Sequence, residues 1–307
     1  MFHVFNTIIP IFVIILLGWL VRAKGLLIRD LISPLNRLVY YLAIPAMIFR
    51  AVASSSFRAH FDAYLLIGTL VPVAFLFAVL LGVSRILRID RGHCGTFLQG
   101  SFHGNLGYIG LAVAYYYLGS EGFTRAGILA GFLMLVQNFF SILGLQIYSR
   151  EEGAGRGHWF FIKKIMGNPV VISAIGGILF SLLEISLPDI LDRSLSIISG
   201  MALPLALLII GASLSLRVIQ SHLKLTLFVS ILKLLALPAV GLFIYRLFEI
   251  PPEHFLPGLI LLASPSATIV YIMAKELEGS PGLASAAVSL TTLLSSGTFI
   301  FWLGTFS

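Results

Sequence analysis

The sequence has little charge and a single cysteine. Among its 307 residues, 11% are charged and 58% are hydrophobic, which leaves too little polar surface to cover a soluble globule of this size. The lone Cys94 excludes an internal disulfide, and its expected role is that of a small buried residue. No basic stretch is interleaved with aromatic residues, so the net charge of +7 does not indicate nucleic-acid binding. The composition predicts an integral membrane protein that contacts the lipid bilayer.

Acidic residues are missing from the interior of the apolar segments. All 13 aspartates and glutamates lie in predicted loops or at the ends of predicted spans. Neither paired aspartates nor a His-Glu-x-x-His motif occurs at depth, which argues against an intramembrane enzyme, and we expect no metal and no cofactor. The ionisable residues inside the spans are Arg37, His103 and Lys233. An interior that is neutral or positive favours an anionic substrate.

Long apolar runs occupy most of the chain. A bilayer core requires about 20 apolar residues per helix, and such runs predict ten transmembrane helices at 4–22, 31–52, 63–84, 93–118, 126–148, 167–185, 190–216, 223–246, 254–274 and 282–304. The odd-numbered loops and their borders hold thirteen lysines and arginines, whereas the even-numbered loops hold five. By the positive-inside tendency, the odd loops face the cytoplasm and both termini face outward.

The prolines reveal an internal repeat. Pro10 and Gly18 match Pro169 and Gly177 at an offset of 159, and the "AIP" of residues 43–45 matches the "ALP" of residues 202–204 at the same offset. Each half contains five predicted spans, an odd number, so the second copy must run upside down relative to the first. The sequence therefore predicts a first repeat at 1–150, a cytoplasmic linker loop at 151–166 and a second, inverted repeat at 167–307.

Two predicted spans carry polar and helix-breaking residues in their middle. The fourth contains "SFHGNLGYIGLA", and the repeat offset, with a slip of one residue, places its Asn105 beside Pro265 of "LLASPSATIVYIMAKEL" in the ninth. Glycine and proline free backbone groups that lipid cannot satisfy, so we expect two broken helices that cross near the midplane and bind substrate there. A second reading is that the glycines allow close helix packing. The candidate substrate-binding residues are His103, Gly104, Asn105, Gly107, Ser264, Pro265, Ser266 and Thr268.

The ionisable residues in the spans each have two open readings. Arg37 either extends its charge to the membrane surface or contacts the substrate, and Lys233 either bonds an interhelical carbonyl or supplies charge to the substrate. His103 either relays protons or packs as a neutral side chain. Gln137 and Asn138 are predicted to form interhelical hydrogen bonds rather than to bind ligand.

Four motifs, taken in order along the chain, resemble the auxin efflux carrier family: "LNRLVYYLAIPAMIF", "GNLGYIGLA", "ALPLALLIIGASL" and "YIMAKEL". That family includes the plant PIN carriers and bacterial permeases for malonate- and malate-like acids. The resemblance implies an all-α polytopic membrane protein of ten helices in two inverted five-helix repeats, with broken, crossing fourth and ninth helices. It places Asn105 on the family's crossover asparagine and Pro265 on the proline of the ninth helix. The family often has proline where this chain has Ala112, so the first break here depends on glycines.

Together these features predict a secondary transporter of small organic anions, such as mono- or dicarboxylates, in a bacterial inner membrane. A homodimer is left open as the assembly. The alternatives are a sodium-coupled symporter of the related bile-acid type and a channel or sensor with the same fold. The spans lack the carboxylates from which sodium sites generally benefit.

Overall fold

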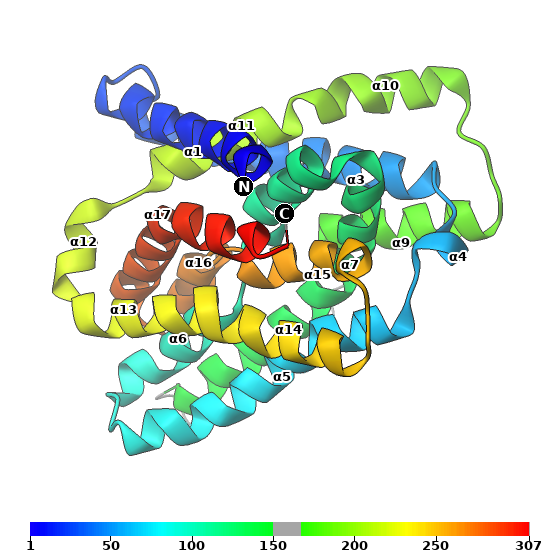
Figure 1. Cartoon of the computed structure of the whole chain (residues 1–307). Helices are drawn as coiled ribbons and strands as arrows, with labels where there is room; N and C mark the ends of the chain where they lie inside the picture. Colours follow the sequence, from blue (N-terminus) through cyan, green and yellow to red (C-terminus); the bar gives the residue numbers. More distant parts are fainter. Residues whose placement is uncertain (150–166, 307) are drawn as a thin grey trace.

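The protein is a bundle of packed helices (Figure 1). The computed structural model describes residues 1–149 and 167–306, so the predicted linker 151–166 lies outside the described residues. Within those two ranges the only β-structure is one isolated bridge. The helices of the first half are α1 (Phe2–Ala23), α2 (Arg29–Leu38), η1 (Val39–Ala43), α3 (Ile44–Ala53), α4 (Phe57–His60), α5 (Ala63–Ile86), α6 (Arg91–Phe102), η2 (Leu106–Gly110) and α7 (Leu111–Tyr148).

The described part of the second half is also helical. Its described helices are α9 (Pro169–Leu182), α10 (Asp189–Gly200), α11 (Ala202–Ser213), α12 (Leu216–Ser221), α13 (Leu223–Ile231), η3 (Leu232–Ala236), α14 (Leu237–Leu247), α15 (Pro252–Ala263), α16 (Ile269–Glu276) and α17 (Pro281–Gly304). Short polar side chains begin several of these helices. Asn168 and Asp62 each accept hydrogen bonds from two N–H groups in the first turn of the helix that follows, which satisfies donors that a helix otherwise leaves unpaired.

Seven described segments are long and apolar enough to cross a membrane: Phe2–Ala23, Asp30–Ala53, Ala63–Ile86, Leu106–Tyr148, Asp189–Ser213, Leu223–Leu247 and Pro281–Gly304. The predicted span 167–185 corresponds to a shorter apolar helix, Pro169–Leu182. The predicted spans 93–118 and 254–274 are interrupted in the middle, as expected. The segment Leu106–Tyr148 continues through Gly119, whose non-helical φ of 70° and ψ of −163° mark the predicted turn between the fourth and fifth spans.

Prolines inside two spans coincide with widened helical turns. The π-helices η1 and η3 directly precede the turns that contain Pro45 and Pro238. Proline cannot donate a backbone hydrogen bond, and its ring clashes with the carbonyl one turn earlier, so a wider turn relieves the contact. Both spans continue through these prolines, as Asp30–Ala53 and Leu223–Leu247.

Two close helix contacts involve the glycines that defined the repeat. A Cβ on Gly18 of α1 would meet the backbone carbonyl of Leu208 in α11, and a Cβ on Gly177 of α9 would lie 3.1 Å from the backbone carbonyl oxygen of Phe49 in α3. The two contacts are related by the repeat offset: Gly177 lies 159 positions after Gly18, and Leu208 lies 159 positions after Phe49. Figure 1 shows α1 beside α11 at the upper left and α3 beside α9 at the right.

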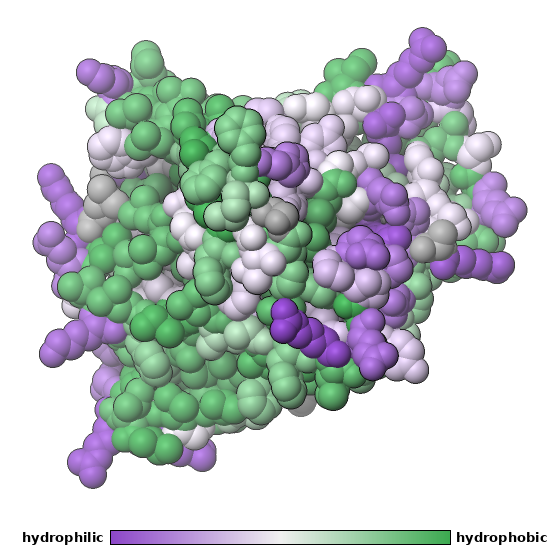
Figure 2. Space-filling view, viewed as in Figure 1, coloured by the Kyte–Doolittle hydropathy of each residue, from purple (hydrophilic) through white to green (hydrophobic). Residues whose placement is uncertain are grey.

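The outer surface is largely apolar. Figure 2 shows hydrophilic residues at the left edge and on the right of the view, with a broad hydrophobic area between them. Many large apolar side chains on this surface are exposed, including Ile9, Val13, Leu16 and Phe75. Water would not tolerate so much exposed apolar area, whereas lipid tails match it. The molecule is therefore a multi-pass membrane protein.

Candidate functional site

Two helices are interrupted at the centre of the fold. Helix α6 ends at Phe102, and the chain becomes helical again at Leu106. Helix α15 ends at Ala263, and α16 begins at Ile269. Extended backbone angles at His103 and Ser264 open the two breaks, with ψ of 97° and 141°.

The two interrupted segments pair with each other. The N–H of Asn105 donates to the carbonyl oxygen of Pro265 at 2.7 Å, and the N–H of Ala267 donates to the carbonyl oxygen of His103 at 2.9 Å. These bonds form an antiparallel bridge between Gly104 and Ser266. Backbone groups released by the breaks are thereby satisfied inside the protein, as a membrane interior requires.

Glycines permit this close crossing. A Cβ on Gly110 would lie 2.7 Å from the Ser264 hydroxyl oxygen, and one on Gly104 would lie 3.3 Å from the Lys233 ammonium nitrogen. A Cβ on Gly107 would make only an ordinary contact with Met134. The two readings of these glycines are therefore compatible: the helix is broken at Gly104, and the glycines at 104 and 110 also allow close packing.

A cavity of about 390 Å³ opens at the crossing, between the two breaks, α2, α7 and the start of α9. We name it the Arg37 cavity. Six predicted site residues line it: Arg37, His103, Gly104, Asn105, Gly107 and Thr268. Ser264, Pro265, Ser266 and Lys233 are not among its lining residues. The structure thus brings part of the predicted set to one cavity and places the rest behind it.

Asn105 lines this cavity and carries an unpartnered donor. The residue is 5% exposed, and its buried amide nitrogen Nδ2 has no hydrogen-bond partner among the described residues. Buried polar atoms are nearly always paired, so an unpartnered amide beside a cavity is an unusual feature, and chemically it could donate to an acceptor such as a carboxylate oxygen.

His103 and Gln137 form hydrogen bonds that connect the end of α6 to α7. His103 Nδ1 lies 2.7 Å from the Ser141 hydroxyl oxygen, and Gln137 Nε2 donates to the carbonyl oxygen of Phe102 at 3.1 Å. The prediction that Gln137 forms an interhelical hydrogen bond is confirmed. Asn138 instead lines the Arg37 cavity.

Lys233 lies behind the crossing. Its side chain is fully buried, and its ammonium group donates to the carbonyl oxygen of Leu262 at 2.7 Å. Leu262 belongs to the last turn of α15, where helix carbonyls lack intrahelical partners and carry partial negative charge. One of the two readings of Lys233, a hydrogen bond to a backbone carbonyl of another helix, is therefore present. The side-chain nitrogen also lies close to Gly104.

The serines of the second break hold the backbone in place. The Ser266 hydroxyl donates to the carbonyl oxygen of Gly100 at 2.7 Å, and the Ser266 N–H donates to the Thr291 hydroxyl oxygen at 3.0 Å. The Ser264 hydroxyl donates to the carbonyl oxygen of Ile260 at 2.9 Å. Both hydroxyls are thus committed to backbone carbonyls.

Polar residues that the sequence reading did not select also line the cavity. The Tyr108 hydroxyl donates to Asn36 Oδ1 at 2.7 Å, and both residues border the cavity together with Asn168. Glu276 lines it as well, so one carboxylate accompanies the guanidinium of Arg37. Among the described residues, no cluster of three or more histidine, cysteine or acidic side chains could hold a metal ion. In the sequence, Asn36 and Tyr108 could have been found as polar side chains within largely apolar stretches.

Comparison with known proteins agrees with this architecture. The family model described as "Membrane transport protein" matches residues 3–155 and 158–303. An uncharacterized transporter of Methanothermobacter thermautotrophicus is 27% identical over 304 residues, covering 97% of this chain and 96% of that protein.

Two further relatives are similar over comparable lengths. An uncharacterized transporter of Methanocaldococcus jannaschii is 24% identical over 97% of both chains. A Rhizobium meliloti protein named "Putative malonate transporter" is 24% identical over 97% of this chain and 94% of its own. The chain therefore belongs to the membrane transport protein family, the auxin efflux carrier family, whose members are transporters and not enzymes.

Proposed function

We propose that this protein is a secondary transporter of small organic anions that works by alternating access around the crossing of its two broken helices. The observation that carries the proposal is that Asn105, which lines the Arg37 cavity where the breaks pair, has a buried Nδ2 without a described hydrogen-bond partner. Transporter sites formed by discontinuous helices typically lie at such a crossing.

The proposed architecture is ten spans in two inverted repeats, 1–150 and 167–307. The contact of Gly18 with Leu208 and that of Gly177 with Phe49 support it, because all four residues obey the offset of 159. A Cβ on Gly304 would lie 2.7 Å from Met1 Sδ, so Met1 and Gly304 lie side by side, which agrees with an even number of spans because such a number places both on the same membrane face. We place both termini outside a bacterial inner membrane, as the loop charges favour.

An anionic substrate is favoured by the electrostatics of the crossing. The second half of each broken helix begins at the cavity, with Leu106 and Ile269 among the lining residues. A helix N-terminus presents free N–H groups and a partial positive charge, which bind carboxylates. Arg37 adds a positive charge in the cavity, and the side-chain nitrogen of Lys233 lies behind Gly104. The malonate named for the Rhizobium meliloti relative is an anion of this class.

The test is binding and uptake by purified protein in proteoliposomes, using labelled malonate, malate and acetate. Asn105→Ala should weaken binding of the preferred anion at least tenfold, about 1.4 kcal/mol, while the melting temperature stays near that of the wild type. Asn6→Ala, which alters an exposed asparagine on α1, is the matched control and should bind normally.

Two outcomes would contradict the proposal. Full binding by Asn105→Ala would place the site elsewhere, and failure of the wild type to bind or move any of the anions would reject the substrate class. Accumulation of anion against its gradient would separate a coupled carrier from a channel or sensor with the same fold.

A further inference from the structure

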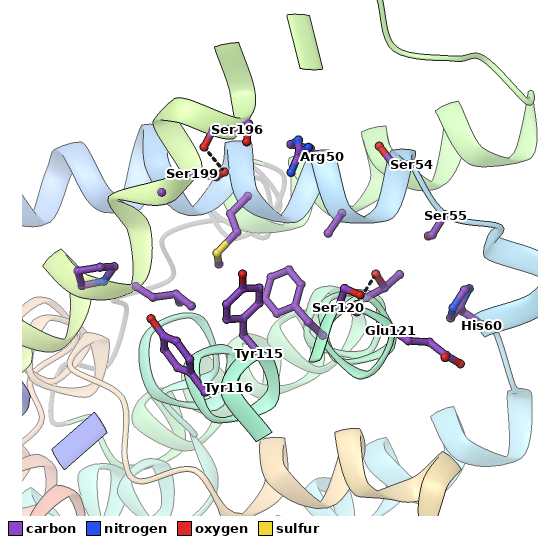
Figure 3. Close-up of a pocket in the computed structure, with 17 residues that line it drawn as sticks. Arg50, Ser54, Ser55, His60, Tyr115, Tyr116, Ser120, Glu121, Ser196 and Ser199 are labelled. Atoms are coloured by element: carbon purple, nitrogen blue, oxygen red, sulfur yellow. Dashed lines mark hydrogen bonds between the residues drawn. The ribbon is translucent and has the colours of Figure 1, made fainter. Parts of the chain in front are cut away.

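A second cavity lies away from the crossing. It has a volume of about 730 Å³ and is bordered by α3, α10 and α7. Figure 3 shows Tyr115 and Tyr116 on α7 facing the helix that carries Arg50, with Ser196 and Ser199 on the neighbouring helix. We name it the Arg50 cavity.

The two cavities are lined by opposite ends of one span. Arg37 and Arg50 both belong to the segment Asp30–Ala53 and are thirteen residues apart. A helix rises 1.5 Å per residue, so the two residues are separated by about 20 Å along the span. A solute beside Arg37 is therefore nearer one membrane face, and a solute beside Arg50 is nearer the opposite face.

The cavities correspond to each other through the repeat. Six residues of the second span line the Arg37 cavity, and the residues 159 positions after four of them line the Arg50 cavity: Arg37, Tyr40, Tyr41 and Ile44 correspond to Ser196, Ser199, Gly200 and Leu203. This is the same offset that relates the prolines and the two glycine contacts. The two cavities are therefore lined by equivalent positions of the two repeats, and at these positions they differ in which side chains are present.

The main difference is positive charge. Arg37 forms no ion pair with a described carboxylate, and its counterpart Ser196 is neutral. In the other cavity, Arg50 is bound through two bonds to Asp192: Nε to Oδ1 at 2.7 Å and Nη2 to Oδ2 at 3.1 Å. Such a two-point pair neutralises the guanidinium and fixes its direction.

Other charged groups also border the two cavities. Each cavity is lined by one glutamate, Glu276 in the Arg37 cavity and Glu121 in the Arg50 cavity. Glu121 accepts from Arg125 at 3.1 Å, and His60 is a further titratable group in the Arg50 cavity. The unpaired arginine thus distinguishes the first cavity from the second.

We propose that the transporter binds its anion more tightly from the Arg37 side than from the Arg50 side, because Arg37 is available to the anion and Arg50 is held by Asp192. This inference depends on the proposed function, since it assumes that the anion reaches the crossing from both cavities. The asymmetry sets the substrate concentration at which each face is half-saturated. It does not change the equilibrium distribution, which the gradients determine.

The experiment measures the KM for labelled malonate from each side, in proteoliposomes whose orientation is fixed by blocking one face with a membrane-impermeant thiol reagent at an engineered cysteine. In the wild type, the KM should be about tenfold lower from the Arg37 side. Arg37→Ser should raise the KM on that side about tenfold and leave the other side nearly unchanged, and Arg37→Lys should partly restore it. Asp192→Asn should lower the KM on the Arg50 side, because it releases Arg50.

The possible failures are distinguishable. Equal KM values on both faces of a wild type that transports malonate would overturn the sidedness and leave the proposed function intact. An Arg37→Ser variant that shifts both faces equally would do the same. If neither malonate nor any anion of the panel binds or is transported, the proposed function fails, and the sidedness fails with it.

Discussion

The backbone N–H of Asn105 donates to the carbonyl oxygen of Pro265 at 2.7 Å, although the two residues are 160 positions apart in the chain. The bond joins the break in the first half to the break in the second half. It satisfies a donor and an acceptor that no helix could satisfy at these positions. The side-chain amide of Asn105 is thereby held at the cavity, and its Nδ2 is left without a described partner.

Gly110→Ala should destabilise the protein by about 1–3 kcal/mol, because the added methyl group would lie 2.7 Å from the Ser264 hydroxyl oxygen where the broken helices approach. Gly82→Ala in α5 is the matched control, since a Cβ there meets nothing within 4 Å. That variant should be neutral or slightly more stable. Thermal unfolding in detergent checks both. A Gly110→Ala variant as stable as the wild type would contradict the close approach.

Ser266→Ala and Thr268→Ala should have different effects although both remove a hydroxyl from the second break. The Ser266 hydroxyl donates to the carbonyl oxygen of Gly100 and does not line the cavity, so its loss should lower stability by about 1–2 kcal/mol. Thr268 lines the Arg37 cavity, so its replacement should weaken anion binding severalfold with little change in melting temperature. Binding isotherms and melting curves measured on both variants test this; the reverse assignment of effects would be inconsistent with the site.

Replacement of sodium by potassium or choline should leave transport intact. Carbonyls at the C-terminal ends of half-helices commonly coordinate sodium, but here the Lys233 ammonium donates to the Leu262 carbonyl at 2.7 Å. A dianion leaving a cell at about −100 mV gains about 4.6 kcal/mol, so export needs no coupled cation. Initial uptake rates in the three salts measure the effect. A strict sodium requirement would favour the sodium-coupled symporter instead.

Single cysteines should report the N-terminus and the loop that follows α9 on the outer face. In a Cys94→Ala background, a cysteine at His3 and one at Glu184 should react with a membrane-impermeant maleimide in intact cells. His3 precedes the first predicted span and Glu184 lies at the end of the sixth, so the chain between them crosses the membrane an even number of times. A cysteine at Lys24 should react only after the cells are permeabilised. The opposite labelling pattern would invert the orientation without affecting the repeat.

The sequence by itself determined the membrane class, most of the spans and the positions of both breaks. These properties depend on local physics: an apolar run of about 20 residues is sufficient to cross a bilayer, and glycine or proline weakens a helix wherever it occurs. The offset of 159 also related Gly18 to Gly177 before any contact was known. Both breaks occur in the predicted spans.

Only the tertiary structure decided which side chains reach the cavity. Ser266 and Thr268 are two residues apart in one irregular segment, yet the first bonds a backbone carbonyl of α6 and the second borders the cavity. In a segment that is neither helix nor strand, no sequence periodicity predicts the direction in which each side chain points. The neutralisation of Arg50 by Asp192, 142 positions away, likewise depends on how α3 packs against α10. The free energy of such a pair depends on three-dimensional distance and burial, which one sequence does not contain.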